Sequence, residues 1–433
     1  MVAVINTLIF PTLWVLASAS SHVGTPLLSQ QCPLPIPAYQ LQRQTCLKSE
    51  SSRPGNITKK VEHPVPPLWV RSKSCMNRGK TEYCAFTKPS FSGGEGVSVV
   101  TTPERVSRLE ATGIFTDKEG QAPRLHNSAS SYEDAEVPGK GIGLVATKPI
   151  RAGQRIMTRT PAVMIDRSAL DALSEDESVA LLVQGVEALP SIHRDRYLNL
   201  TTHLSVASHQ TRISQIFAVN SFRTGVGDQG ADFHSVFTEI SRLNHDCRPN
   251  CVYYFDPDTL SNKVYAVRDI MVGEEITVSY IDGFQTSAAR RERLHEHWGF
   301  DCSCPACTAE PYLVSESDSR IRQILQLWAE LDDYSAAATS AKAPSPEKAE
   351  LLIDLYRLER LEGRLQEAYY RAAIEYLGVG KIAPAMKYAR LCIDSGLKFK
   401  GPGKPFLASM EDLLRDPKGH KYWRFRMSKS TDV

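Results

Sequence analysis

The decapeptide RLNHDCRPNC, residues 242–251, places two cysteines, two asparagines, a histidine and an aspartate within ten positions. Thiols and imidazoles are the groups with which proteins bind metal ions, and amides and carboxylates hold polar ligands or close turns. An apolar run that is typical of a strand, NCVYYFD, overlaps its end. Residues 242–251 are therefore the first candidate for a functional site.

The composition of the whole chain indicates a folded protein of more than one domain. Its 433 residues are enough for two or three domains that each bury a core. Charged residues make up 23% and apolar residues 42%, which is ordinary for a globular protein. The net charge of only +2 gives no electrostatic argument for binding to nucleic acid or to a membrane surface.

The start of the chain has the pattern of a targeting segment. Residues 1–19 are apolar and uncharged and end in small residues, which predicts a signal peptide. A short membrane anchor and an artefact of start-codon choice stay open as alternatives, because no basic residue precedes the apolar stretch. With the signal peptide removed, no membrane span is expected.

The next segment, residues 20–130, is rich in Ser, Pro and Thr and has few apolar runs, which predicts a region of low order. A glycosylation sequon at Asn56 suits an oxidising compartment. Four cysteines in this segment would then form two disulfides in one of three pairings. Free thiols in a disordered tail are the alternative. The four are Cys32, Cys46, Cys75 and Cys84.

The remaining chain has an α+β pattern. Short β-branched runs between Gly and Pro predict strands over 131–285, with a helical insertion at 166–225 that contains a capping box at Ser174 and Glu177. A cysteine-rich segment follows at 286–310. Helical spacing of apolar residues over 315–433 predicts an all-α domain, whose helices resemble tetratricopeptide hairpins although no repeating period is evident.

Four motifs follow one another in a set order. They are GKGIGLVA (139–146), NHDCRPN (244–250), EITVSYI (275–281) and CSCPAC (302–307). The glycines do not indicate a dinucleotide site, because a strand-like run and not a helix follows them. Together the motifs resemble the SET-domain protein lysine methyltransferases over about residues 137–307, and most closely the SMYD-like branch and its fungal relatives. The interval 161–235 lacks cysteine, so the MYND finger of SMYD proteins is absent there.

The resemblance implies a β-clip of small twisted sheets with a pseudoknot, and a role for each matching residue. Tyr280 matches the catalytic tyrosine, whose hydroxyl lies beside the transferred methyl group. Trp298 matches an aromatic residue of the lysine channel, and Tyr265 is a further candidate for its wall, although plain strand packing is the alternative. The residues implied to contact S-adenosylmethionine are Lys140, Gly141, Gly143, Ser241, Asn244, His245, Tyr280 and Phe300.

This chemistry depends on positioning. Methyl transfer from a sulfonium requires the attacking nitrogen, the carbon and the sulfur to be collinear. A lysine amine attacks only when it is neutral, yet its ordinary pKa is about 10.4. A dry channel with aromatic walls disfavours the ammonium form and therefore assists the reaction.

The cysteines that follow the decapeptide predict a structural zinc site. A tetrahedral zinc needs four ligands, and the tail supplies Cys302, Cys304 and Cys307. Cys247, about 55 residues earlier, offers the fourth. Four thiolates complete the set without His245, and such a site would dock the tail over the cofactor and carry Phe300 into place.

The sequence therefore predicts a protein-lysine methyltransferase that acts on a histone tail or another protein. The alternative is a catalytically silent SET fold that binds a peptide partner through its C-terminal helices, and a third possibility is a secreted protein whose cysteines are bridged. The compartment stays open. The leader indicates the secretory pathway, whereas zinc thiolates and the family resemblance indicate the nucleus or cytoplasm.

Overall fold

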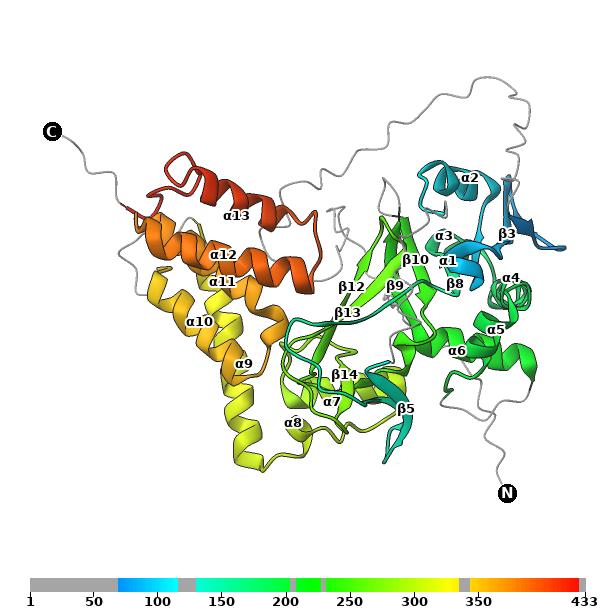
Figure 1. Cartoon of the computed structure of the whole chain (residues 1–433), viewed down its shortest axis with the longest axis horizontal. Helices are drawn as coiled ribbons and strands as arrows, with labels where there is room; N and C mark the ends of the chain where they lie inside the picture. Colours follow the sequence, from blue (N-terminus) through cyan, green and yellow to red (C-terminus); the bar gives the residue numbers. More distant parts are fainter. Residues whose placement is uncertain (1–68, 116–129, 203–207, 227–230, 335–342, 428–433) are drawn as a thin grey trace, which may run out of the picture.

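The computed structural model describes residues 69–115, 130–202, 208–226, 231–334 and 343–427. Within these ranges three β-sheets lie between two groups of helices, one built from the N-terminal half of the chain and one from the C-terminal end (Figure 1). The proposed signal peptide, the sequon at Asn56, Cys32 and Cys46 lie outside the described residues.

The largest sheet, of seven strands, combines residues that are far apart in the sequence. Its order is β1-β3-β4-β8-β10-β9, with β2 also paired to β3, and β4 runs parallel to β8. Its strands are β1 (Val70–Arg71), β2 (Met76–Arg78), β3 (Thr81–Lys88), β4 (Val97–Thr101), β8 (Val163–Asp166), β9 (Ser221–Val226) and β10 (Ala231–Val236).

The N-terminal strands overturn part of the prediction of low order for residues 20–130. Residues 69–115 form β1 to β4 and the helices α1 (Phe91–Gly94) and α2 (Pro103–Ala111). All five residues of β4 are buried. Its apolar run VSVV is short and lies among polar residues, and its partner β8 is more than sixty residues later. Pairing with β8 buries β4, and a pattern of neighbouring residues in the sequence cannot predict such a distant partner.

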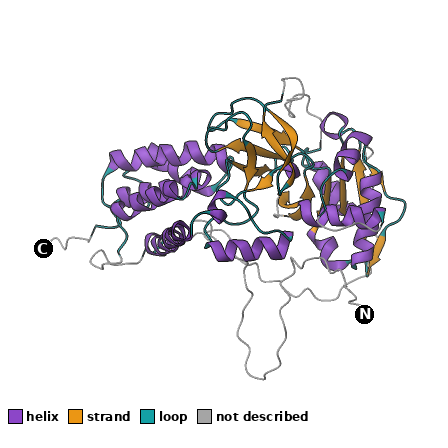
Figure 2. Ribbon diagram, turned by 90° about the horizontal axis from the view of Figure 1, so that it is seen from below, coloured by secondary structure: helices purple, strands orange, loops and turns teal. Residues whose placement is uncertain are grey.

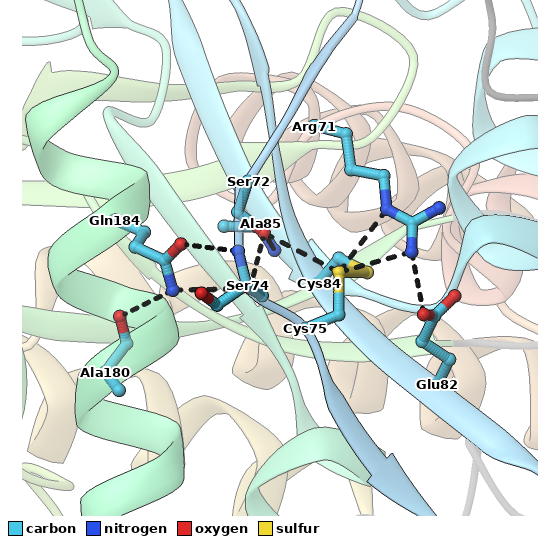
Figure 3. Close-up of a disulfide and its surroundings, with 9 residues drawn as sticks. All are labelled: Arg71, Ser72, Ser74, Cys75, Glu82, Cys84, Ala85, Ala180 and Gln184. Carbon is cyan, nitrogen blue, oxygen red and sulfur yellow. Dashed lines mark hydrogen bonds and ion pairs between the residues drawn. A yellow bond between two sulfur atoms is a disulfide. The ribbon is translucent and has the colours of Figure 1, made fainter.

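A disulfide joins Cys75 to Cys84 beside the hairpin of β2 and β3 (Figure 3). The guanidinium of Arg71 donates to the Cys75 sulfur at 3.3 Å and pairs with Glu82 at 2.7 Å. The Gln184 side chain accepts from the backbone N–H of Ser74, which docks the disulfide segment on a neighbouring helix. This bond is one of the pairings that the sequence allowed.

Four helices fill residues 167–220, within the interval 166–225 where an insertion was expected, and β9 takes up its end. The capping box is confirmed, because Ser174 and Glu177 each accept a hydrogen bond from the other's backbone N–H. The helices are α3 (Arg167–Ala172), α4 (Glu175–Glu187), α5 (Ser191–Leu198) and α6 (His209–Asn220). They bury one face of the large sheet in a common core.

Two smaller sheets carry the decapeptide. One has the order β11-β14-β6-β5 and the other the order β12-β13-β7. A 3₁₀ turn, η2 (Ile240–Arg242), precedes β11. The strands are β5 (Tyr132–Val137), β6 (Gly141–Ala146), β7 (Arg155–Arg159), β11 (Asn244–His245), β12 (Cys251–Asp256), β13 (Ser261–Ala266) and β14 (Glu275–Val278). The pseudoknot expected here stays a prediction.

The C-terminal part is helical, as the sequence predicted (Figure 2). None of the helices within the described ranges is both long and apolar enough to cross a bilayer. The elements are α7 (Ser287–Trp298), α8 (Pro305–Thr308), α9 (Pro311–Leu331), α10 (Pro346–Leu358), η3 (Glu362–Arg364), α11 (Leu365–Gly378), α12 (Ile382–Phe399) and α13 (Pro405–Arg415). The apolar faces of α9 to α13 form one core, whereas the buried residues of α7 and α8 pack around the four cysteines.

A buried ring and a buried ion pair are among the contacts that join this helical domain to the sheets. Phe284, in the loop after β14, is buried in the helical core, with its ring centroid 4.4 Å from that of Trp328 and 5.1 Å from that of Tyr356. Arg248, in the decapeptide, donates at 2.5 Å to Glu359 at the end of α10, and both side chains are buried. The decapeptide is thereby tied to the C-terminal helices.

We expect Glu359→Ala to lower the free energy of unfolding by about 3–5 kcal/mol, because it leaves the buried Arg248 guanidinium without its carboxylate. Chemical denaturation followed by circular dichroism measures the change. Asp354→Ala is the matched control, since it removes an exposed pair with Arg357 and should cost less than about 0.5 kcal/mol. Equal losses in the two variants would contradict the interpretation.

Candidate active site

The decapeptide is held against β14 by hydrogen bonds along its whole length. Asn244 and His245 form β11, which runs parallel to Thr277 and Val278. The buried Asn250 side chain accepts from the Thr277 N–H and donates to the Glu275 carbonyl, both at 2.8 Å. The spacing of the asparagines therefore places the decapeptide in a defined register on β14.

Tyr280 lies two residues after the end of β14 and is anchored through its hydroxyl, which donates to the Leu243 carbonyl at 2.8 Å. Burial raises the pKa of this phenol, so it stays protonated at neutral pH. Because its proton is given to the carbonyl, the lone pairs of the oxygen are left to accept from another group.

His245 links this tyrosine to the cysteine cluster. Its Nδ1 accepts from the Tyr280 N–H at 3.0 Å, and burial lowers the pKa of the imidazole to about 4. A neutral ring that accepts at Nδ1 carries its proton on Nε2, which lies 3.3 Å from the Cys247 sulfur. The imidazole therefore donates to that sulfur, and both of its nitrogens are used inside the protein.

Glu275 connects two of the predicted cofactor residues. Its carboxylate accepts from the Lys140 ammonium at 2.6 Å and from the Asn244 side-chain amide at 2.9 Å. The Asn244 carbonyl oxygen is thereby turned away from Glu275. Gly143 packs closely against Asn244 and Glu275, because a Cβ at this position would lie only 2.6 Å from the Asn244 Nδ2. Gly141 has a φ of +76°, which favours glycine in the preceding turn.

A cavity of about 440 Å³ opens beside Tyr280, large enough for a small ligand. Three predicted site residues line it, Ser241, Tyr280 and Trp298. The rings of Tyr280 and Trp298 lie 5.5 Å apart. The whole lining is residues 218–223, Ile240, Ser241, Leu243, residues 253–255, Asn262, Tyr280, Arg293, His297 and Trp298.

The other predicted cofactor residues are absent from this lining but adjoin it. They are Lys140, Gly141, Gly143, Asn244, His245 and Phe300. Asn244 follows directly after Leu243, which does line the cavity, and the ring of Phe300 lies 6.2 Å from that of His245. The structure therefore gathers these residues around β11, next to the wall that contains Tyr280.

Tyr265 is not brought to the cavity. In the antiparallel pair of β12 and β13 it lies opposite Val252, and its ring stacks on that of Tyr254 at 5.9 Å. Residues opposite each other share a face of the sheet, so Tyr265 and Val252 face away from Tyr253. Val252 contacts the C-terminal helices at Gly363, whereas Tyr253 lines the cavity.

The four cysteines predicted to bind metal do meet. The sulfurs of Cys247, Cys302, Cys304 and Cys307 all lie within 4.8 Å of one another, and all four residues are buried. The sulfurs of Cys247 and Cys307 are 3.6 Å apart. A tetrahedral zinc with bonds of about 2.3 Å places its sulfurs about 3.8 Å apart, so the cluster fits that ion.

The chemistry of the thiols points the same way. Hydrogen bonds from Cys247 and Cys302 lower the pKa of Cys304 to about 5, and hydrogen bonds from the other three thiols lower that of Cys307, whereas hydrogen bonds with the same three neighbours raise the pKa of Cys247. Buried thiolates require a nearby cation, and a divalent metal at their centre supplies it. The cluster could therefore hold a metal. Cys251 is buried elsewhere, as a small apolar residue.

Comparison with known proteins agrees with this geometry. Residues 141–281 match the SET domain model. The chain therefore contains a SET domain. It is 31% identical to histone-lysine N-methyltransferase set5 of Schizosaccharomyces pombe over 194 residues, which are 45% of this chain and 56% of that protein. The resemblance to SET-domain proteins of the SMYD type is thereby confirmed.

Two SMYD relatives match shorter or weaker stretches. Human histone-lysine N-methyltransferase SMYD3 is 43% identical over 75 residues, 17% of each chain. Mouse N-lysine methyltransferase SMYD2 is 26% identical over 254 residues, 57% of this chain and 52% of that protein. The chain thus spans about half or less of the length of these relatives.

Sequence reasoning missed several residues that shape the SET-domain site. Glu275 was assigned only to a strand, although a carboxylate in the apolar run EITV was a signal. Asn220 and Phe222, which line the cavity, were assigned only to the helical insertion; Asn220 is the last residue of α6, whereas Phe222 lies in β9. The Asn220 carbonyl accepts from the Ser241 hydroxyl at 3.3 Å. These contacts join residues that are far apart in the sequence, so no pattern of neighbouring residues predicts them.

We expect the purified chain to bind one zinc ion, which elemental analysis measures. Cys247→Ser should reduce the zinc content to well below one ion per chain, because three thiolates remain for an ion that needs four ligands. Cys251→Ala removes a buried thiol that lies outside the cluster and should keep the metal. Full zinc content in the Cys247 variant would exclude this cysteine as a ligand.

Proposed function

We propose that this chain transfers a methyl group from S-adenosylmethionine to the ε-amine of a protein lysine. The observation that carries the proposal is the position of Tyr280, whose buried phenol lines the cavity and gives its proton to the Leu243 carbonyl. The proposal is supported by the SET domain match and by the methyltransferase names of the relatives.

The residues around β11 fit the proposed cofactor. Asn244 offers a carbonyl oxygen whose direction is set by Glu275, and Phe300 offers an aromatic face. Gly141, where a Cβ would meet nothing within 4 Å, leaves the backbone open for close approach. When bound there, S-adenosylmethionine would supply an electrophilic methyl group.

The cavity residues would receive the lysine. Tyr253, Trp298 and Phe222 give it aromatic walls, which disfavour a buried ammonium and so favour the neutral amine. The lone pairs of the Tyr280 oxygen can accept a hydrogen bond from that amine and hold its nitrogen in line. These residues would orient the amine and exclude water, and no strong acid is needed.

Zinc is proposed at the four cysteines in a structural role. It would hold the tail, with Trp298 and Phe300 just before Cys302, against the decapeptide that contains Cys247. The His245 side chain, which donates to the Cys247 sulfur and accepts from the Tyr280 N–H, would couple the metal site to the position of the tyrosine.

We expect Tyr280→Phe to reduce kcat for methyl transfer on the order of 10²-fold, because the ring stays but the positioned oxygen is lost. Radiolabelled transfer to lysate proteins or peptides measures the rate. Tyr265→Phe makes the same change at a tyrosine outside the cavity and should alter kcat less than about twofold. Wild-type protein that contains zinc but transfers no label would favour the catalytically silent SET fold.

We expect Glu275→Gln to weaken S-adenosylmethionine binding about 10-fold, because a charge-assisted bond to Asn244 is lost and the Lys140 ammonium loses its partner. Isothermal titration calorimetry measures the Kd. Glu136→Gln makes the same substitution at an exposed position of β5 and should leave the Kd unchanged. An unchanged Kd in Glu275→Gln would remove Glu275 from the cofactor site.

A further inference from the structure

The charged side chains that line the cavity are all basic in the part of the chain that the structure describes. Arg223 extends from β9, and Arg293 and His297 extend from α7. No aspartate or glutamate is among the described lining residues. The chain as a whole carries a net charge of only +2, so this local bias does not follow from the composition.

Helix α7 sorts its charges between two faces. Arg293 and His297 are four residues apart and share the face that borders the cavity with Trp298. Glu292 and Glu296 are one position earlier on each turn, about 100° around the helix, and neither lines the cavity. The helix therefore presents basic groups to the opening and acidic groups elsewhere.

The two arginines differ in how they are engaged. Arg223 pairs at 2.5 Å with Asp232 of the adjacent strand, which does not itself line the cavity. Arg293 is exposed, and within the described ranges it has no hydrogen bond or ion pair. Its guanidinium presents five donors in a planar fork that matches a carboxylate.

Arg223 and Arg293 line the cavity that is proposed to receive the substrate lysine. The cavity contains Tyr280 and Trp298, whereas Asn244, Lys140 and Gly143 of the proposed cofactor site do not line it. The Lys140 ammonium is already paired with Glu275. A substrate segment that enters the cavity therefore meets the Arg293 guanidinium, which no carboxylate of the described residues pairs, whereas Arg223 is already paired with Asp232.

We propose that the substrate of this site is an acidic protein segment, in which aspartate or glutamate residues flank the target lysine. The inference rests on the proposed function and narrows its substrate class. Carboxylates beside the lysine would bind the Arg293 guanidinium and steer the segment to the cavity, whereas a lysine- and arginine-rich segment such as a basic histone tail would be repelled.

The test uses the full chain and three fluorescent peptides with one central lysine and flanking glutamate, alanine or arginine residues. Fluorescence polarisation measures binding at low salt, and radiolabel transfer measures kcat/KM. We expect the acidic peptide to bind at least about 10-fold more tightly than the basic one, with a difference that shrinks as ionic strength rises. Equal binding, or tighter binding of the basic peptide, would overturn the inference.

Charge reversal identifies the residue responsible. Arg293→Glu should abolish or invert the preference, and Arg293→Lys should restore most of it. Arg322→Glu makes the same change at an exposed position of α9, away from the cavity, and should keep the preference.

Two further outcomes would distinguish a role of Arg293 in peptide binding from a role in cofactor binding, and the acidic-substrate inference from the proposed methyl transfer. A weaker S-adenosylmethionine Kd in Arg293→Glu, with an unchanged peptide preference, would mean that the arginine serves the methyl donor and would overturn the inference. Preferential binding of the acidic peptide without transfer to any peptide would support acidic recognition and count against the proposed function.

Discussion

The arrangement of the candidate site depends on the meeting of one cysteine from the decapeptide with three from a tail about 55 residues later. Burying four thiolates within 4.8 Å of one another costs free energy unless a cation neutralises them. The tail begins just after α7, which ends at the left-handed Gly299, and the rings of Trp298 and Phe300 lie beside those of Tyr280 and His245 respectively.

The decapeptide is crowded because its successive side chains face different parts of the protein. Asn244 bonds the Glu275 carboxylate, and His245 bonds both the Tyr280 backbone and a cysteine sulfur. Arg248 reaches Glu359 on the helical domain, and Asn250 bonds β14. One short segment thus joins the proposed cofactor region, the cysteine cluster and the C-terminal helices, so each position carries a separate constraint.

The sequence predicted the parts of the site that lie within motifs. The four cysteines, Asn244 and Tyr280 were identified because their spacing is itself the signal, and the structure brings them to one region. Tyr265 does not line the cavity, and its position could not be predicted because strand alternation does not tell which face of a sheet a partner will cover. The partners of Glu275 and Arg248 could not be predicted, since they are fixed only by tertiary packing. The N-terminal strands were missed for the same reason.

The burial of Phe284 among the C-terminal helices bears on where this protein can be divided. The ring belongs to the loop that starts just after Tyr280, yet it is covered by Trp328 and Tyr356. A fragment that stopped at the end of the cysteine tail would leave an aromatic surface exposed four residues from the catalytic candidate, and would lose the carboxylate that neutralises Arg248. The matched domain and the helices beyond it thus share a buried core and a buried ion pair, so a division between them would expose apolar surface close to the Tyr280 phenol.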